Sequence, residues 1–333
     1  MDLDLRLLRY FTAVADELHF GRAAAKLYIS QPALSKQIRK LEDQLGTPLL
    51  IRDSRHVTLT PRGQRLLEDA RQLLALAERM KYEPQPNVVR IAHIFELMTS
   101  REVADAYTSA RPGVQLVERN LTSLGQLLAL LNNLLDVAIL RVTAQMLADH
   151  PTGWHHRLLR LEPMHLVGRP GDPARATASL HERPIEVFAD APGSGLYNVH
   201  GQYMTAFERH TGLTMRWLGN PGTFGHCLAV IRRAGSPAFL FEFDSYAIKY
   251  AEAGLPVHSP AEIQPYFPWS IAWREEQLPQ PIADLLDIAE ETAIRRHWRN
   301  PPQPTQAPAW IPPDDPGPPE LRLPGAPERS PPR

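Results

Sequence analysis

The chain has 333 residues, of which 43% are hydrophobic, and its formal net charge at pH 7 is −1. This length suffices for two domains with substantial cores, and the balanced charge means that affinity for nucleic acid must come from a local patch. The single cysteine, Cys227, excludes an intrachain disulfide framework and is typical of a reducing compartment. We expect Cys227 to be a small buried apolar residue.

The N-terminus carries Asp2 and Asp4 where a secretory signal peptide would carry basic residues, and no apolar run is long enough to span a membrane. The sequence therefore predicts a cytoplasmic protein. The first predicted helix has an apolar face that should support the helices after it, formed by Leu5, Leu8, Phe11, Val14 and Leu18.

Two further helices are predicted over about residues 21–27 and 31–45, with a tight connection between them. Ser30 is a good N-cap for the second helix, and Pro32 fits its first turn because no intrahelical donor is needed there. The apolar stripe of this helix consists of Leu34, Ile38, Leu41 and Leu45. Such a pair is typical of helix-turn-helix proteins.

The opposite face of the second helix is polar and basic. Gln31 and Ser35 lie one turn apart near the helix N-terminus, the end that enters the major groove in helix-turn-helix proteins. Gln can read adenine edges, and Ser can bond to base edges or phosphate. Lys36, Arg39 and Lys40 are placed to contact phosphates. The alternative interpretation is a solvated charged face, which is the commonest fate of such a surface.

The residues after this helix favour DNA binding. Residues 49–52 and 57–59 are predicted strands around the turn 53–56, which is the wing of a winged helix-turn-helix. Arg52, Arg55 and His56 would lie beside the DNA backbone or minor groove. Basic residues exceed acidic ones between residues 30 and 65, where Lys36, Arg39, Lys40, Arg52, Arg55, Arg62 and Arg65 stand against Glu42, Asp43 and Asp53.

The run AAAKLYISQPALSKQIRKLEDQLGTPLLIRDSRHVTLTPRG resembles the N-terminal domain of the LysR-type transcriptional regulators. The match is dense and nearly gapless, and it departs from the family at Ile51, where Glu or a nearby aromatic residue is usual. The resemblance implies a winged helix-turn-helix DNA-binding domain over residues 1–60. Its predicted DNA-binding residues are Gln31, Pro32, Ser35, Lys36, Arg39, Arg52, Arg55 and His56.

A long helix over residues 61–84 is predicted next, with Thr60 as cap and Pro61 in the first turn. Its apolar residues repeat at alternating spacings of four and three, as in a coiled coil, and are Leu66, Ala70, Leu73, Ala77 and Met80. In the resembling family this linker helix pairs two subunits, so these residues are predicted to mediate dimerisation. The alternative is a helix packed on its own domain. Pro84 and Pro86 predict a hinge.

Residues 88–300 alternate predicted strands and helices, which argues for parallel sheets with helical crossovers and an overall α/β fold class. The spacing permits two lobes, the first over about 88–163 and 266–300 and the second over about 164–265. The resemblance implies the same: a two-lobed effector domain akin to periplasmic solute-binding proteins. Of residues 301–333, 13 are proline, so a disordered tail is predicted there. A docking role for Trp310-Ile311 is a minor alternative.

A small effector is expected between the lobes, near strand C-termini and helix N-termini. Three segments should reach this crevice, namely 93–100, 121–123 and 192–198. The predicted effector-binding residues are Phe95, Glu96, Thr122, Ser194, Gly195 and Asn198. The acidic Glu96 would repel a carboxylate effector unless it turns away or pairs with a cation. For each residue, helix capping or loop structure is an equally good explanation.

No catalytic constellation emerges, and no metal site or cofactor is predicted. Gly193-Ser194-Gly195 lacks the second spacer of a nucleophile elbow, and His150, His155 and His156 lack the ligands that would complete a zinc site. We therefore predict a non-enzymatic regulator that binds double-stranded DNA as a homodimer or homotetramer and responds to a small-molecule effector. RNA polymerase is a further candidate partner. The alternative is a ligand-binding α/β protein whose N-terminal domain mainly mediates assembly.

Overall fold

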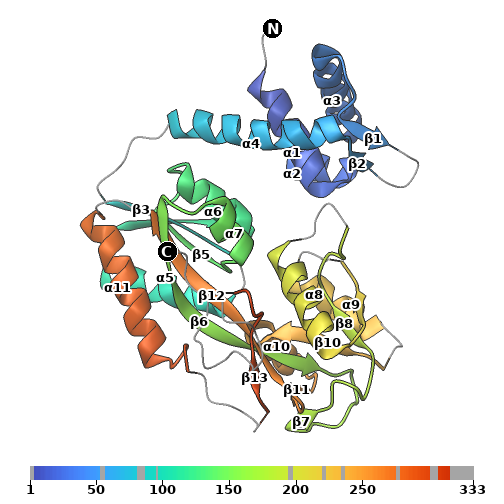
Figure 1. Ribbon diagram of the computed structural model, residues 1–333, viewed down its shortest axis with the longest axis vertical. Helices are drawn as coiled ribbons and strands as arrows, with labels where there is room; N and C mark the ends of the chain where they lie inside the picture. The colour runs from blue at the N-terminus through green and yellow to red at the C-terminus, as the bar shows by residue number, and fades with distance from the viewer. Residues whose placement is uncertain are drawn as a thin grey trace. The chain divides into compact units, whose positions relative to one another are not determined.

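The computed structural model describes residues 4–52, 57–80, 87–94, 97–193, 198–219, 223–233, 237–274, 278–300 and 307–315. Contacts divide the chain into a first unit, mainly residues 1–83, and a second unit that comprises 84–192 and 198–333. Figure 1 labels the helices and strands of both units, and each unit is described by itself. None of the helices in the described ranges is long and apolar enough to cross a membrane.

The first unit contains four helices and a two-stranded antiparallel sheet among its described residues: α1 (Leu5–Glu17), α2 (Phe20–Lys26), α3 (Gln31–Leu45), β1 (Leu50–Arg52), β2 (Val57–Leu59) and α4 (Pro61–Met80). All four helices and β1 contribute to one apolar core. The predicted apolar face of α1 is wrong at its ends. The buried face of α1 contains Leu8, Phe11 and Val14 as predicted, and it also contains Leu7. Leu5 is 38% exposed, and Leu18 is the left-handed C-cap of the helix.

The first lobe of the second unit is a sheet with helices on both faces. Its strands are β4 (Gln115–Asn120), β3 (Val88–His93), β5 (Val137–Leu140), β12 (Gln264–Arg274) and β6 (Trp154–Val167), in that order. The helices α5 (Met98–Ala110) and α11 (Gln280–Arg295) share one core with the sheet. The helices α6 (Ser123–Leu131) and α7 (Ala144–Asp149) contribute to a second core. Val89 and Ile91 contribute to the first of these cores and Ala92 to the other, as the alternation of a strand requires.

The second lobe repeats this three-layer plan. Its sheet order is β6, β10 (Phe239–Phe243), β8 (Ile185–Val187) and β9 (Met215–Trp217), with β11 (Val257–Pro260) paired to β6 and β7 (Thr177–Ala178) paired to β11. The helix α8 (Val199–Thr211) packs in one core, and α9 (Phe224–Arg233) and α10 (Asp244–Glu252) pack in the other.

The long strands β6 and β12 belong to both lobes, and Figure 1 shows the two strands side by side as they run from one lobe to the other. β6 pairs with β12 as far as Pro163 and with β10 from Met164 onward. The prediction of parallel sheets is wrong for these strands, because β6 runs antiparallel to β10 and β12, and β12 runs antiparallel to β5. An antiparallel strand lets the chain enter the second lobe without a helical crossover.

The prediction of a disordered tail over 301–333 is wrong for residues 307–315. β13 (Ala309–Trp310) pairs in parallel with the start of β12, and Trp310 and Ile311 are each 2% exposed. The prediction relied on the proline count. Proline has no backbone N–H to donate, but a proline-rich segment can still form a short edge strand when it also contains a few large apolar residues. Residues 301–306 and 316–333 lie outside the described residues.

Candidate DNA interface and effector site

The recognition surface of the first unit is the face of α3 opposite its buried stripe. Ser30 caps the helix by accepting a hydrogen bond from the Ala33 backbone N–H at 3.3 Å, and Pro32 occupies its first turn. The stripe of Leu34, Ile38 and Leu41 is fully buried. The predicted DNA-contact residues on this helix all avoid that stripe, since Ser35 is half-buried and the rest are exposed: Gln31, Pro32, Lys36 and Arg39.

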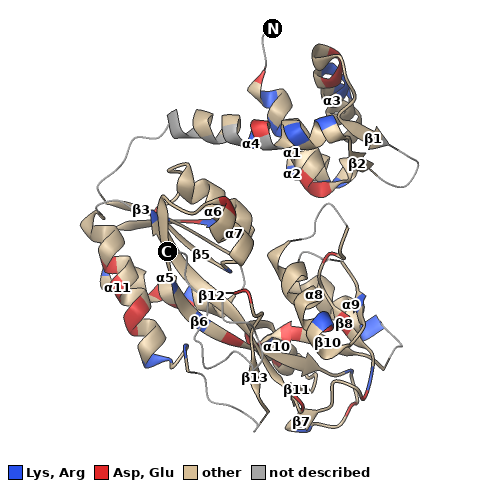
Figure 2. Ribbon diagram, in the orientation of Figure 1, with Lys and Arg blue, Asp and Glu red and all other residues tan. Residues whose placement is uncertain are grey.

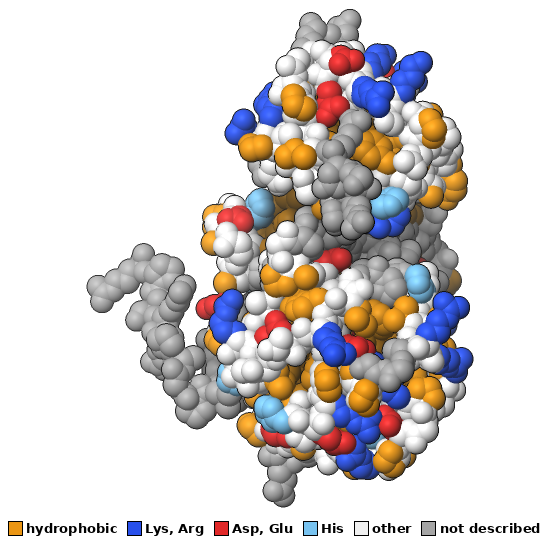
Figure 3. All heavy atoms as spheres, turned by 90° about the vertical axis from the view of Figure 1, so that its right-hand side faces the viewer, with side chains coloured by type: hydrophobic (Ala, Val, Ile, Leu, Met, Phe, Trp, Pro, Cys, Tyr) orange, Lys and Arg blue, Asp and Glu red, His pale blue; other side chains and the backbone are white. Residues whose placement is uncertain are grey.

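Charge on the first unit is displayed at its surface. Lys and Arg positions recur along α3, and several blue side chains project from the first unit, the upper part of Figure 3 (Figures 2 and 3). Lys40, also predicted to contact phosphate, is exposed on the same helix. Arg52 lies in β1, while Arg55 and His56 lie outside the described residues. The described part of the predicted interface therefore comprises the exposed face of α3 and Arg52 of β1.

The backbone of the wing is held to α3 by hydrogen bonds and lies in close contact with α4. A carboxylate oxygen of Glu42 accepts hydrogen bonds from the backbone N–H groups of Leu49 and Leu50 at 2.9 and 3.2 Å. Gly63 approaches the wing so closely that a Cβ there would lie 2.1 Å from the Leu49 carbonyl oxygen. These contacts set where β1 begins relative to the recognition helix.

The predicted dimerisation residues on α4 divide into two groups. Leu66 and Ala70 are buried in the core of the first unit, so the prediction is wrong for them: they pack against the same unit. Leu73 is 43% exposed and Ala77 is half-buried. Leu76, which the prediction omitted, is 41% exposed. The side chain of Met80, together with Pro84 and Pro86, lies outside the described residues.

Two of the predicted effector residues are helix caps. The Thr122 hydroxyl accepts from the Gly125 backbone N–H at 3.2 Å at the start of α6. The Asn198 side-chain oxygen accepts from the backbone N–H groups of His200 and Gly201 at the start of α8. The capping explanation therefore accounts for both side chains. The remaining four predicted residues lie outside the described residues: Phe95, Glu96, Ser194 and Gly195.

An arginine that the sequence prediction missed brings these two helix starts together. Arg141 directly follows β5 in the first lobe and is 3% exposed. Its backbone N–H donates to the Ser123 hydroxyl at 3.2 Å, next to Thr122. Its guanidinium donates to the carbonyl oxygen of Val199, next to Asn198, so the segments 121–123 and 198–199 both contact this residue. The signal available in the sequence was an Arg directly after the apolar run 137–140.

The charge of Arg141 is matched by Asp315. The guanidinium donates from Nε to Asp315 Oδ2 at 2.7 Å and from Nη2 to Asp315 Oδ1 at 2.9 Å. Burial raises the pKa of Asp315, while the adjacent Arg141 acts to lower it. Burial, followed by the positive charge of Arg141, lowers the pKa of His200 to about 4, so His200 is neutral at pH 7.

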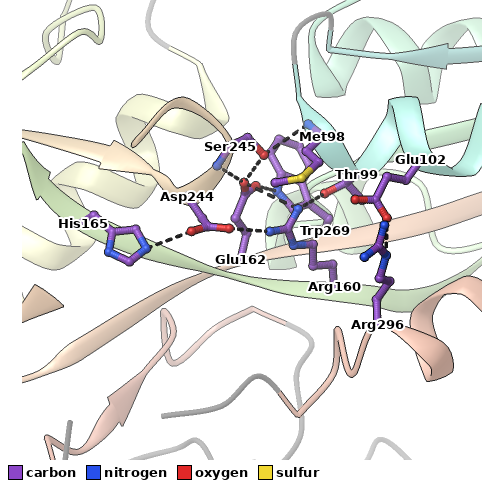
Figure 4. A network of polar contacts seen from close by, with 10 residues as sticks. All are labelled: Met98, Thr99, Glu102, Arg160, Glu162, His165, Asp244, Ser245, Trp269 and Arg296. Atoms are coloured by element: carbon purple, nitrogen blue, oxygen red, sulfur yellow. Dashed lines mark hydrogen bonds and ion pairs between the residues drawn. The ribbon is translucent and has the colours of Figure 1, made fainter. Parts of the chain in front are cut away.

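A second polar network joins the lobes beside the crossing strands (Figure 4). Glu162 on β6 is fully buried and accepts hydrogen bonds from the Ser245 backbone N–H at 2.9 Å and from Trp269 Nε1 at 2.5 Å. The Ser245 hydroxyl donates to Glu162 and accepts from the Met98 backbone N–H at 3.1 Å. α5 has no side-chain cap of its own, so a residue of the second lobe satisfies its first turn.

Arg160 extends this network. Its guanidinium donates to the Thr99 hydroxyl at 2.9 Å and to Asp244 at 3.0 Å. Asp244 also contacts His165 at 3.1 Å. Thr99 belongs to the segment 93–100 that was predicted to reach the crevice, and its hydroxyl takes part in this network between the lobes. The network ties the first turn of α5 to the first turn of α10.

A winged helix-turn-helix unit followed by a two-lobed α/β domain defines the class of this protein. Residues 5–64 match the model of the family described as "Bacterial regulatory helix-turn-helix protein, lysR family". The uncharacterized HTH-type transcriptional regulator YnfL of Escherichia coli (strain K12) is 38% identical over 209 residues, which are 60% of this chain and 70% of that protein. This chain belongs to the LysR family.

A second relative agrees with this assignment, and a solved structure agrees with the fold. The HTH-type transcriptional regulator BudR of Raoultella terrigena is 34% identical over 217 residues, which are 59% of this chain and 71% of that protein. The crystal structure of full-length BenM covers 90% of this chain and 100% of its own with a TM-score of 0.53 and 22% identity. The BenM comparison shows the fold.

Proposed function

We propose that this chain is a sequence-specific DNA-binding transcriptional regulator controlled by a small molecule bound between its two lobes. The main observation behind this proposal is that α3 exposes Gln31, Lys36 and Arg39 on the face opposite its fully buried apolar stripe, within a winged unit. Gln can read base edges, whereas Lys and Arg neutralise phosphates. The names of YnfL and BudR as HTH-type transcriptional regulators support the same function.

The test uses the full chain and duplex DNA selected by it from a randomised pool. We expect Gln31→Ala and Ser35→Ala each to weaken binding to the selected duplex by about 1–3 kcal/mol, with little effect on unrelated duplexes. Lys36→Ala should weaken binding to every duplex and reduce the slope of log affinity against log salt by about 1. Arg101→Ala is the matched control, because Arg101 is exposed on α5 of the second unit.

The results separate the two candidate functions. If the chain selects no duplex and the Lys36 and Arg101 variants behave alike, the first unit does not read DNA and the assembly alternative stands. If DNA is bound but Gln31 and Ser35 variants retain full specificity, α3 is not the recognition helix.

We also propose that α4 pairs two subunits. Leu73 and Leu76 are large apolar side chains, each more than two-fifths exposed, on a helix whose first half is anchored in its own unit. Because Leu73 and Leu76 continue along α4 beyond the buried Leu66 and Ala70 and are themselves exposed, they favour packing against a helix of a second subunit. A dimer would present two copies of α3 to two half-sites of an operator.

Control by a ligand requires two arrangements of the lobes with different ligand affinity. The contacts of Arg141 with Val199 and of Ser245 with Met98 define one arrangement, in which each lobe satisfies backbone groups at a helix start of the other. Val199 also packs against the first-lobe core that contains Leu127 and Leu140. We infer that an effector binds near Arg141 and changes the balance between this arrangement and a more open one.

A further inference from the structure

The segment 307–315 packs as part of the second unit, although its proline-rich composition predicts a disordered tail. Its anchor is Trp310, whose ring lies 5.1 Å from the Phe207 ring and 5.4 Å from the Tyr203 ring, measured between centroids. The His210 ring stacks against Trp310 at 5.5 Å. All three partners lie on α8, so the segment is held by the second lobe through apolar contacts.

The far end of the same segment crosses to the first lobe. Asp315 is 2% exposed, and each of its two carboxylate oxygens accepts a hydrogen bond from the Arg141 guanidinium. The Asp315 backbone N–H donates to the Pro312 carbonyl oxygen at 3.0 Å, which closes a turn that aims the carboxylate. Arg141 and Asp315 are separated by 174 positions in the sequence. The segment therefore links a second-lobe core to a first-lobe cation.

The arginine needs a carboxylate at this place. A buried charge that loses its partner costs several kcal/mol, and a planar guanidinium fits a carboxylate through paired N–H donors. His200 is neutral, and the Tyr203 and Phe267 rings lie 5.4 and 5.5 Å from the Arg141 guanidinium carbon. The surroundings of the ion pair are thus aromatic, and they suit a ligand with one carboxylate and an apolar remainder.

We propose that Arg141 is a carboxylate-binding site, that Asp315 is its intramolecular occupant, and that a small external monocarboxylate acts by displacing Asp315. The segment 307–315 is then a tethered ligand that bridges the lobes until an effector replaces its terminal contact. The regulatory part of this proposal rests on the proposed function, whereas the binding site itself does not.

The first experiment measures thermal unfolding of the full chain with sodium acetate, with acetamide as neutral isostere and with sodium chloride at equal ionic strength. Asp315→Ala opens space beside Arg141, so acetate at about ten times its Kd should raise the Tm of this variant by about 3–6 °C. Acetamide and chloride should not. Asp314→Ala is the matched control, because Asp314 is exposed in the same turn. Equal acetate shifts in the Asp315→Ala and Asp314→Ala variants would overturn the site.

Asp315→Asn keeps the test decisive if Asp315→Ala does not fold. The amide keeps the shape of the side chain and removes its charge, so acetate should compete with it successfully. We expect acetate, and not acetamide, to increase hydrogen exchange in residues 309–315 of this variant. Unchanged exchange in acetate would count against the site.

The second experiment measures affinity for the selected duplex with and without acetate. If acetate alters the duplex affinity of the parent chain, and Asp315→Ala without acetate shows a change in the same direction while Asp314→Ala behaves like the parent, both the site and its regulatory role are supported. If acetate stabilises Asp315→Ala, but neither acetate on the parent chain nor the Asp315→Ala substitution changes duplex affinity, the site stands and control of DNA binding through it fails. Loss of duplex binding by the parent chain would instead refute the proposed function and leave the thermal result intact.

Discussion

Gly63 is the position where one added methyl group should disturb the DNA-binding unit most clearly. It lies in the first turn of α4, and a Cβ built there would lie 2.1 Å from the Leu49 carbonyl oxygen and 3.0 Å from the Leu49 carbonyl carbon. Both atoms are backbone, so no side-chain rotation can relieve the overlap. In Gly63→Ala, α4 must move away from the wing by about 1 Å to restore ordinary contact.

That movement breaks hydrogen bonds that now join the wing to α4. The Thr60 backbone N–H donates to the Leu49 carbonyl oxygen at 2.9 Å, and the Thr60 hydroxyl both donates to the Pro48 carbonyl oxygen and accepts from the Gly63 N–H at 2.9 Å. Overpacking costs about 1–3 kcal/mol and loss of the cap about 1 kcal/mol. The better helix propensity of Ala returns about 0.5–1 kcal/mol. The net result is destabilisation of the first unit by about 1–3 kcal/mol.

Hydrogen exchange followed by mass spectrometry is the suitable assay. All six Trp residues of the chain follow residue 150, so tryptophan fluorescence would report on the second unit alone. Exchange of residues 57–67 should accelerate by roughly 5–150-fold, and affinity for the selected duplex should fall. Gly113→Ala is the control, because a Cβ at Gly113 meets no atom within 4 Å. Parental exchange and duplex affinity in Gly63→Ala would refute the reasoning.

Three further outcomes follow from buried or exposed groups. Burial raises the pKa of Glu242 to about 8, with Glu162 adding to the shift, so the folded state binds this proton more tightly than the unfolded state does. Stability from this group is full below about pH 4.5 and is lost as pH rises through 8; the Tm of Glu242→Gln relative to the parent should therefore increase between pH 5 and 9. Asp136→Ala should destabilise the second unit by about 3–5 kcal/mol in urea unfolding, because it leaves Arg90, now paired to Asp136 at 2.6 Å and 5% exposed, without its carboxylate. Leu73→Glu should shift the sedimentation of the full chain toward a monomer and weaken binding to a two-half-site duplex, whereas an unchanged sedimentation profile with parental affinity would exclude α4 as the pairing helix.

Local signals made the first unit predictable. Ser30, Pro32 and Gly46 mark the start and end of α3, and the structure places an N-cap, a first-turn proline and a left-handed C-cap at these residues. The same rules could not tell which α4 residues were buried by their own unit. Leu66 and Leu73 have the same chemistry and occupy one periodic stripe, and they differ only in that the first half of α4 packs into the core of its own unit.

The second unit was predictable in its alternation of elements and less so in its connections. The strand β5 (Val137–Leu140) is a short apolar run between Asp136 and Arg141, a pattern that favours a buried strand. The effector residues were harder. Thr122 and Asn198 were selected for their positions at helix starts, and both cap those helices. Arg141 and Asp315 are far apart in sequence, so no local pattern could pair them.

The contacts between the lobes are of a kind that a ligand can shift. The Ser245–Met98 and Arg141–Val199 contacts are hydrogen bonds, which contribute about 0.5–1.5 kcal/mol net when neutral and about 1.5–3 kcal/mol when one group is charged. A ligand at 100 times its Kd supplies about 2.7 kcal/mol, which is comparable to the loss of two or three such bonds. The β6–β12 register shifts between Trp269 and Ser270, beside the Trp269–Glu162 hydrogen bond, so the pairing of the two long strands is irregular at this point. A ligand that binds a more open arrangement of the lobes can therefore outweigh these polar links, and this differential affinity is what effector control requires.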